Sequence, residues 1–184
     1  MTKIVGISGS LRRGSYNSGL LDAAKDSVPA GVTLEIASIR GIPLYDGDVE
    51  ARDGLPSAVV ALKEAMASAD GILLSTPEYN SGIPGVFKNA IDWASRPSSD
   101  IAKVFGDKPV ALMGASPGNF GTILSQNGWL PVLRTLGTRL WNGGKMMVPQ
   151  AGKSFDTDGK LTDDAVRQRL QKFLSGFVEF IQGK

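Results

Sequence analysis

Short apolar runs alternate with amphipathic segments from one end of the chain to the other, and this alternation restricts the possible folds most strongly. Buried strands are expected over residues 4–7, 32–39, 71–75, 109–113 and 145–148. Apolar residues at spacings of three and four predict helices over residues 20–28, 55–69, 84–94, 123–136 and 166–181. Strands that alternate with helices form right-handed βαβ units. The chain is therefore predicted to be an α/β protein with a parallel sheet covered on both faces.

The chain has 184 residues, which fits one domain, and no internal repeat or linker divides it. Two Pro/Gly-rich ranges, 41–56 and 95–109, are predicted to be loops between elements. The last helix has the clearest start. Thr162 suits its N-cap, and Asp163 and Asp164 suit the positive end of a helix.

The sequence contains no histidine and no cysteine, and these absences exclude several classes of enzyme. Cysteine nucleophiles, iron–sulfur clusters and zinc–thiolate sites are excluded, as are Ser-His-Asp triads and histidine metal ligands. If the chain is an enzyme, a cofactor, a carboxylate or a tyrosine carries its chemistry. Asp156, Asp158 and Gly159 lack the twelve-residue pattern of a calcium loop, so no metal site is expected.

The charge balance and the apolar segments indicate the expected environment. The net charge of +2 is too small to point to nucleic acid or an anionic membrane as a partner. The first residues, Met1 to Gly6, resemble a strand rather than a signal peptide. No apolar stretch approaches the ~20 residues that a membrane-spanning helix needs. The cytoplasm is the expected location.

Open α/β sheets bind ligands beyond the carboxyl ends of their strands, so the loops after the first, third and fourth strands are the candidates for a site. The first loop, residues 9–18 (GSLRRGSYNS), places two arginines and several hydroxyl groups at the start of a helix. Backbone N–H groups and the helix dipole favour a phosphate there. Gly9 and Gly14 have the spacing of a Walker loop, but Ser15 and Tyr16 stand where Lys and Ser/Thr are required, and no G-x-G-x-x-G is present. The alternative is a turn that only caps a helix, and the arginines favour phosphate.

The second loop, residues 75–85 (STPEYNSGIPG), has two prolines and two glycines that fix its shape around Tyr79. It could hold a flat heteroaromatic ring with backbone N–H groups facing the polar edge, or be a rigid turn in which Tyr79 only packs. The third loop, residues 114–121 (GASPGNFG), has small residues that allow a ligand to approach the backbone, and a plain strand-to-helix turn is its alternative. Together the loops describe a phosphate pocket beside a planar-ring clamp. This combination suits a mononucleotide, and flavin mononucleotide (FMN) best.

At these loops the sequence resembles the NADPH-dependent FMN reductases of flavodoxin-like fold. Within that family it is similar to bacterial NAD(P)H:quinone reductases, some of which are described as chromate reductases. The matching segments are GSLR at 9–12 through Asn17, PEYN at 77–80, GVFKNAIDW at 85–93 and FDTDGKLTD at 155–163. The resemblance implies a three-layer α/β sandwich with a five-stranded parallel sheet in the order 2-1-3-4-5. It also implies a single FMN-binding domain over residues 1–184.

The resemblance further implies FMN held without a covalent bond. The phosphate is expected at the first loop and the isoalloxazine ring at the second, with the third loop closing the remaining side. The expected cofactor-binding residues are Ser10, Leu11, Arg12, Arg13, Gly14, Ser15, Tyr16, Asn17, Pro77, Glu78, Tyr79, Asn80 and Ser116. Arg13 could instead hold a phosphate of NADPH or be a surface residue. The range 119–122 departs from the double-glycine form of the quinone-reductase branch. This difference concerns the assignment of the electron acceptor and does not concern flavin binding.

The implied activity is ping-pong hydride transfer from NADPH or NADH through FMN to a quinone, free flavin, chromate or another small acceptor. No catalytic side chain is expected, because the flavin carries the electrons. Similar proteins form dimers, often paired into tetramers, so a homodimer or homotetramer is expected, and the helix at 85–93 is expected to serve core and subunit packing. Two alternatives from other classes remain. One is a flavodoxin-type electron carrier, against which Arg12 and the net charge argue, and the other is a flavin-free nucleotide-binding module.

Overall fold

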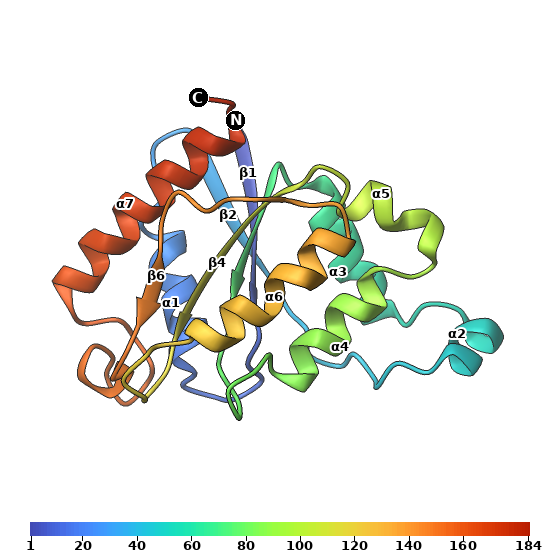
Figure 1. Cartoon of the computed structure of the whole chain (residues 1–184), viewed down its shortest axis with the longest axis horizontal. Coiled ribbons are helices and arrows are strands. Elements are labelled where there is room, and N and C mark those ends of the chain that lie inside the picture. Colours follow the sequence, from blue (N-terminus) through green and yellow to red (C-terminus); the bar gives the residue numbers. More distant parts are fainter.

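The computed structural model describes residues 1–184, the whole chain. A parallel sheet in the strand order β2-β1-β3-β4-β5 crosses its centre, with β6 also paired to β4 (Figure 1). The strands are β1 (Thr2–Ser8), β2 (Val32–Ala37), β3 (Gly71–Ser75), β4 (Pro109–Ala115), β5 (Arg139–Leu140) and β6 (Met146–Val148). The predicted α/β fold and the order 2-1-3-4-5 are confirmed.

The position of the fifth strand is divided between β5 and β6, where the sequence predicts one strand over residues 145–148. β5 pairs with the beginning of β4 and β6 with its end. Between them lies Trp141, whose ring packs against Phe173 of the last helix with centroids 4.9 Å apart. Gly143 and Gly144 lie so close to this ring that a Cβ on either would clash with it. The space that the indole occupies explains why the chain leaves the sheet here.

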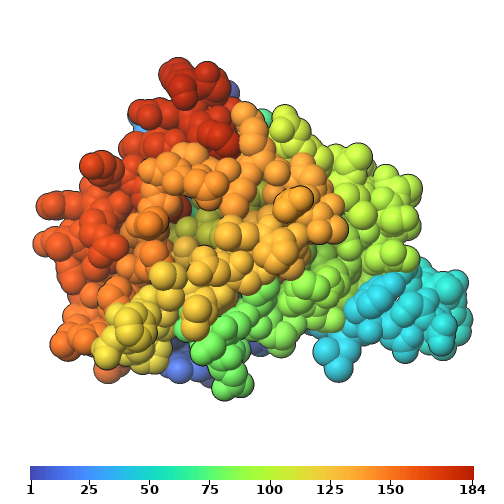
Figure 2. Space-filling model, in the orientation of Figure 1, coloured from blue at the N-terminus to red at the C-terminus, as the bar shows by residue number.

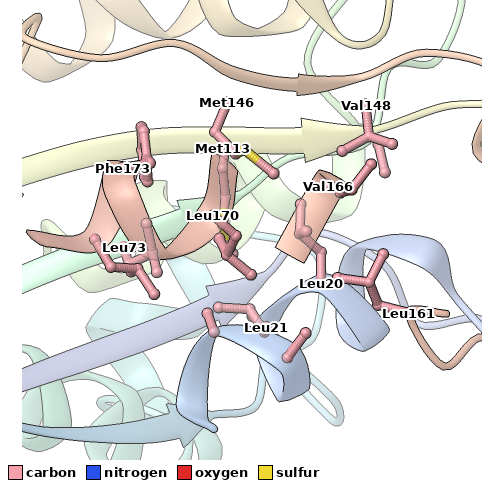
Figure 3. Packing of buried hydrophobic residues seen from close by; sticks show 14 of the residues in the cluster. Leu20, Leu21, Leu73, Met113, Met146, Val148, Leu161, Val166, Leu170 and Phe173 are labelled. Carbon is pink, nitrogen blue, oxygen red and sulfur yellow. The ribbon is translucent and has the colours of Figure 1, made fainter. Parts of the chain in front are cut away.

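The sheet separates two apolar clusters, because successive side chains of a strand point to opposite faces. Leu73 packs in one cluster and its neighbour Leu74 in the other. On the first face lie α1 (Tyr16–Lys25) and α7 (Asp164–Ile181), whose side chains converge with those of β4 and β6 in Figure 3. The opposite face is covered by α3 (Ser57–Ser68), α4 (Gly85–Ala94) and α6 (Ile123–Thr135).

Two helix starts differ from the prediction, and polar contacts explain both differences. α1 begins at Tyr16 rather than at residue 20, because the Ser15 side chain caps it and the polar first turn shows no apolar periodicity. α7 is capped by Asp163 rather than by Thr162. Asp163 Oδ1 accepts hydrogen bonds from the backbone N–H groups two and three residues later (2.9 and 3.1 Å), while the Thr162 hydroxyl donates to the Ser154 carbonyl.

The ranges 41–56 and 95–109, which are predicted to be loops, contain short helices. The first contains α2 (Gly47–Asp53), and the second contains a 3₁₀ turn (Ser98–Asp100) followed by α5 (Ile101–Val104). α2 buries no residue and projects from the body of the molecule (Figures 1 and 2). A short helix without a buried face has no apolar periodicity, so the sequence pattern does not reveal it.

The KNAIDW segment of α4 holds the chain that leads into α2 by hydrogen bonds. Asn89 Nδ2 and Trp93 Nε1 both donate to the Pro43 carbonyl, at 2.8 and 2.9 Å. Asn89 Oδ1 also accepts a hydrogen bond from the backbone N–H of Tyr45 (2.8 Å). Trp93 is fully buried, so the segment has a packing role within the chain. Among all the helices, none combines the length and hydropathy needed to cross a bilayer.

Candidate functional site

The three loops that the sequence singles out meet at one edge of the sheet. Ser8 at the end of β1 is paired with Ser75 at the end of β3, and Ser75 is paired with Met113 near the end of β4. Two backbone hydrogen bonds continue the pairing into the loops, from Gly9 N to Ser75 O (2.9 Å) and from Thr76 N to Met113 O (2.8 Å). The strand order reverses between β1 and β3, and ligands of open α/β sheets bind at such a switch point.

One cleft at this edge is lined by residues from all three loops. Nine of the thirteen expected residues line it, namely Ser10, Arg12, Ser15, Tyr16, Asn17, Pro77, Glu78, Tyr79 and Ser116. Ala115 and Pro117 complete the lining and are absent from the sequence-based set. Leu11, Arg13, Gly14 and Asn80 are not part of the lining. The loops thus come together in space as expected. Fewer residues line the cleft than the sequence-based set proposed.

The first loop presents a set of donors that fits a phosphate. The backbone N–H groups of residues 13–16 donate to no acceptor in the chain. The guanidinium of Arg12 lines the cleft and makes neither an ion pair nor a hydrogen bond with any side chain or carbonyl. Gly14 adopts a φ of +59°, which favours glycine and turns the loop into α1. Free N–H groups at a helix N-terminus beside an unpaired arginine are the donors that a phosphate monoester needs.

Asn17 holds the first loop against the other two. Its side-chain Nδ2 donates to the Ala115 carbonyl (2.8 Å), and its Oδ1 accepts from Ala115 N (3.0 Å) and from Ser75 Oγ (3.2 Å). The side chain is buried, with 4% of the residue exposed. The Ser75 hydroxyl has one hydrogen, which it shares between Asn17 Oδ1 and the nearer Asn17 backbone carbonyl (2.9 Å). Through these contacts Asn17 acts as a clamp between α1 and the ends of β3 and β4. The sequence suggested a phosphate ligand at this position, and the contacts give its amide a positioning role.

The second loop is a tight hairpin turn that exposes one aromatic ring. Tyr79 and Gly82 exchange two backbone hydrogen bonds (3.2 and 3.1 Å), and the two residues between them have positive φ angles of 50° at Asn80 and 61° at Ser81. Positive φ at both central positions defines a type I′ turn, which is rigid and short. Tyr79 is 49% exposed beside the cleft, and the N–H groups of Glu78 and Asn80 have no acceptor in the chain. The turn therefore offers a ring surface and free donors together.

Glu78 joins the second loop to α6. Its Oε2 accepts hydrogen bonds from Leu124 N (2.8 Å) and Ser125 N (3.1 Å) in the first turn of that helix. Thr122, which precedes α6, makes no side-chain capping bond of its own. A carboxylate at a helix N-terminus satisfies free N–H groups and interacts favourably with the helix dipole. Glu78 is thus the cap of α6, supplied from a different part of the chain.

Replacing Glu78 by Ala is expected to lower the free energy of unfolding by about 1 kcal/mol, the usual cost of removing a helix N-cap. The substitution Glu78→Gln keeps an oxygen that can accept both bonds and serves as the matched control. Its stability should stay within about 0.5 kcal/mol of the wild type, because only the charge is lost. Urea unfolding of the three proteins measures the difference. Equal stability of the Ala variant and the wild type would contradict a capping role.

A buried polar cluster joins the second loop to α6. The Thr76 hydroxyl lies 2.8 Å from Ser125 Oγ and accepts a hydrogen bond from Trp129 Nε1 (3.0 Å), and all three residues are fully buried. In the third loop, Ser116 Oγ donates to the Gly121 carbonyl (2.5 Å) and closes the turn. This hydroxyl is therefore engaged within its own loop, and no local sequence pattern indicates any of these three contacts.

Arg40 belongs to the same edge of the sheet and was not anticipated. Its Nη2 donates to the Leu11 carbonyl of the first loop (2.7 Å). Arg40 lies three residues after the end of β2. The rule that ligands bind beyond the carboxyl ends of strands therefore points to Arg40 as well, once it is applied to the second strand. Its backbone N–H is held by Ser38 Oγ (3.1 Å), which fixes the turn after β2.

The largest hollow of the molecule lies next to this cleft rather than in it. A groove of about 400 Å³ runs beside α1 on the far side of Gly14. Asp22, Asp26 and Asp158 line it, together with Lys160 and Arg167. Three carboxylates repel a phosphate, so this groove does not compete with the cleft for one.

The chain is similar to known proteins over nearly its whole length. The family model for NADPH-dependent FMN reductases matches residues 2–153. The chain is 46% identical over 180 residues to an NAD(P)H-dependent FMN reductase of Pseudomonas aeruginosa, an alignment that covers 98% of this chain and 95% of that protein. It is 36% identical over 182 residues to a 2-hydroxy-1,4-benzoquinone reductase of a Burkholderia species, covering 99% of this chain and 97% of the relative.

A solved structure resembles the whole chain. FerB of Paracoccus denitrificans, described as a flavoenzyme NAD(P)H:(acceptor) oxidoreductase, superimposes with a TM-score of 0.87 at 32% sequence identity. The superposition covers 100% of this chain and 98% of FerB. FerB therefore combines a flavin and a nicotinamide donor in one protein of this fold.

Proposed function

The chain belongs to the NADPH-dependent FMN reductase family, and from this premise we propose that it transfers hydride from NADPH or NADH through bound FMN to quinones. The observation that carries the proposal is the unpaired Arg12 beside a run of free N–H groups, in the same cleft as the exposed ring of Tyr79. Relatives are named as reductases of FMN, of quinones and of 2-hydroxy-1,4-benzoquinone, which supports a small organic acceptor.

The first loop is proposed to hold the FMN phosphate. Arg12 supplies charge and a fork of N–H donors, and Ser10, Ser15 and Tyr16 line the same cleft. The N-terminus of α1 adds free N–H groups and the positive end of its dipole. Asn17 does not need to touch the phosphate in this proposal, because it keeps the loop in place.

The second loop is proposed to hold the isoalloxazine ring. Pro77 and Tyr79 of the second loop offer apolar surface to the cleft, which Ser116 and Pro117 of the third loop also line. When bound, FMN accepts hydride from a nicotinamide donor and passes two electrons to the acceptor. The free N–H groups of the turn would stabilise negative charge that develops on the ring. The molecule contains no histidine, so no imidazole takes part in proton delivery at this site.

A homodimer or homotetramer and a cytoplasmic location are also proposed. The resemblance to proteins that assemble in this way supports the first. The need for reduced nicotinamide nucleotides supports the second, because the enzyme can work only where the donor is supplied. Analytical ultracentrifugation of the FMN-loaded protein would measure the assembly directly.

The experiment that tests the function is a visible spectrum of FMN-reconstituted, desalted protein before and after anaerobic NADPH, followed by 1,4-benzoquinone. Retained flavin bands that bleach with NADPH and return with the quinone are the expected result. Bound flavin that neither NADPH nor NADH reduces would support the alternative of an electron carrier. Protein that retains no flavin after desalting would contradict the proposal.

A further inference from the structure

Three arginines without a carboxylate partner gather at the edge of the sheet that carries the cleft. Four arginines of the chain form ion pairs, namely Arg52, Arg96, Arg139 and Arg167. The remaining five are Arg12, Arg13, Arg40, Arg134 and Arg169. The first three of these belong to the loops that follow β1 and β2, and all three are exposed.

The sequence around them contains no acid that could balance their charge. No Asp or Glu occurs from Ser8 to Leu21 or from Ile36 to Tyr45. The loop that packs on Gly14 contains Asp158, but no ion pair joins it to any arginine. Arg40 is tied to the first loop by its hydrogen bond to the Leu11 carbonyl, two residues before Arg13. Acids do lie nearby, with Glu78 on the same cleft as Arg12 and Glu35 in the same surface hollow as Arg40, but none forms an ion pair with any of the three arginines.

One FMN phosphate does not account for this charge. The phosphate belongs in the cleft, and Arg12 is the only arginine that lines the cleft. Arg13 and Arg40 lie outside the lining; Arg40 uses Nη2 for the Leu11 carbonyl, and neither guanidinium has an ion-pair partner that would prevent it from meeting a second anion. A phosphate monoester brings about 1.5 to 2 negative charges at pH 7, which matches two guanidinium groups.

The position of Arg40 fits the far end of a dinucleotide. β2 and β4 lie on either side of the β1–β3 pair, three strand spacings apart. At roughly 4.8 Å per spacing, the carboxyl ends of these two strands are about 14 Å apart. The ring clamp of Tyr79 and Ser116 lies at the β3–β4 end, while Arg40 lies at the β2 end. A nicotinamide stacked at the clamp leaves the adenosine half of its dinucleotide free to extend toward Arg40.

We propose that Arg13 and Arg40 form a second phosphate subsite, which binds the 2′-phosphate of NADPH and makes the enzyme select NADPH over NADH. The proposal rests on the proposed function, because it assigns the donor of that reaction. NADPH and NADH differ only in the 2′-phosphate. A site for this group therefore changes the relative affinity for NADPH and NADH and leaves the hydride transfer itself unchanged. Guanidinium groups recognise phosphate by charge-assisted, often bidentate hydrogen bonds.

The test uses FMN-loaded protein and two probes that contain no nicotinamide, adenosine 2′,5′-bisphosphate and adenosine 5′-monophosphate. Calorimetry should show that the wild type binds the bisphosphate at least about tenfold more tightly than the monophosphate. The substitutions Arg13→Ala and Arg40→Gln should each weaken the bisphosphate about tenfold and the monophosphate less than about twofold, as expected for one lost charge-assisted contact. Arg134→Ala, which removes an unpaired arginine from the far end of α6, is the matched control and should change neither.

Steady-state kinetics give a second readout. Arg13→Ala should raise the KM for NADPH about tenfold and the KM for NADH by less than about twofold. Equal binding of the two probes by the wild type, or variants that bind the bisphosphate like the wild type, would overturn the inference. Loss of FMN from Arg13→Ala would also overturn it, because Arg13 would then belong to the flavin phosphate site. A wild type that holds no FMN would instead refute the proposed function.

Discussion

Replacing Asn17 by Ala is expected to lower the free energy of unfolding by about 3 kcal/mol and, through the loosened first loop, to weaken FMN binding. The substitution leaves Ala115 N and Ala115 O buried without their partners, while the Ser75 hydroxyl keeps its shorter hydrogen bond to the backbone carbonyl of residue 17. Each buried polar group without a partner costs about 1–3 kcal/mol. The loss also releases α1 from the end of β4, so the first and third loops no longer share one geometry.

The substitution Asn17→Asp separates the hydrogen bonds from the shape of the side chain. Aspartate has the same size and keeps the oxygen that accepts from Ala115 N. It replaces the amide donor with an oxygen that faces the Ala115 carbonyl, and it places a charge in a buried site. We expect the Asp variant to be at least as destabilised as the Ala variant in thermal and urea unfolding. An Asp variant as stable as the wild type would show that the amide donor is dispensable and would contradict the clamp.

Replacing Arg12 by Ala is expected to raise the dissociation constant of FMN about 30-fold while leaving the stability of the flavin-free protein within about 0.5 kcal/mol. The first effect follows from losing a hydrogen bond to a charged group, at about 2 kcal/mol. The second follows because Arg12 is exposed and touches no acid, so its removal leaves no buried group without a partner. Fluorescence titration of FMN into the flavin-free protein measures the first effect, and urea unfolding measures the second.

Arg12→Lys is the matched variant, since it keeps the charge and loses the planar fork of donors. Its FMN affinity should lie between those of the wild type and the Ala variant. Riboflavin provides a further control, because it has the ring and lacks the phosphate. Arg12→Ala should not change riboflavin binding. Equal weakening of riboflavin and FMN would show that Arg12 acts on the loop as a whole and not on the phosphate.

The order of the elements and the place of the site could be read from the sequence. Alternation of apolar runs and amphipathic segments predicts the parallel sheet, because strands buried on both faces need continuous apolar runs. The rule that ligands bind beyond the carboxyl ends of strands then selects the three loops. The structure places nine of the thirteen expected residues on one cleft formed by those loops. Local patterns were sufficient to locate the site, because the hydrogen-bond donors of each loop lie within about ten consecutive residues.

The roles of individual residues within the site depend on contacts between distant parts of the chain. Asn17 and Ala115 are 98 positions apart, and Glu78 and Leu124 are 46 positions apart. No periodicity or local motif connects such positions. A polar residue in a loop therefore looks like a ligand even where its side chain holds the fold together, and Asn17, Glu78 and Ser116 are all of this kind.

By itself, the sequence determined an α/β fold with a parallel sheet, a phosphate loop at the start of the first helix and a chemistry that needs a cofactor, while the strand order 2-1-3-4-5 was implied only by the family resemblance. It did so because apolar periodicity, glycine and arginine placement, and the absence of histidine and cysteine are all local or compositional facts. Only the tertiary structure decided that the fifth strand is divided around Trp141, that Glu78 caps α6 and that Arg40 joins the first loop. Each of these depends on which side chains come within about 3 Å of one another once the sheet is assembled, and hydrogen bonds at that range are fixed by packing rather than by sequence pattern.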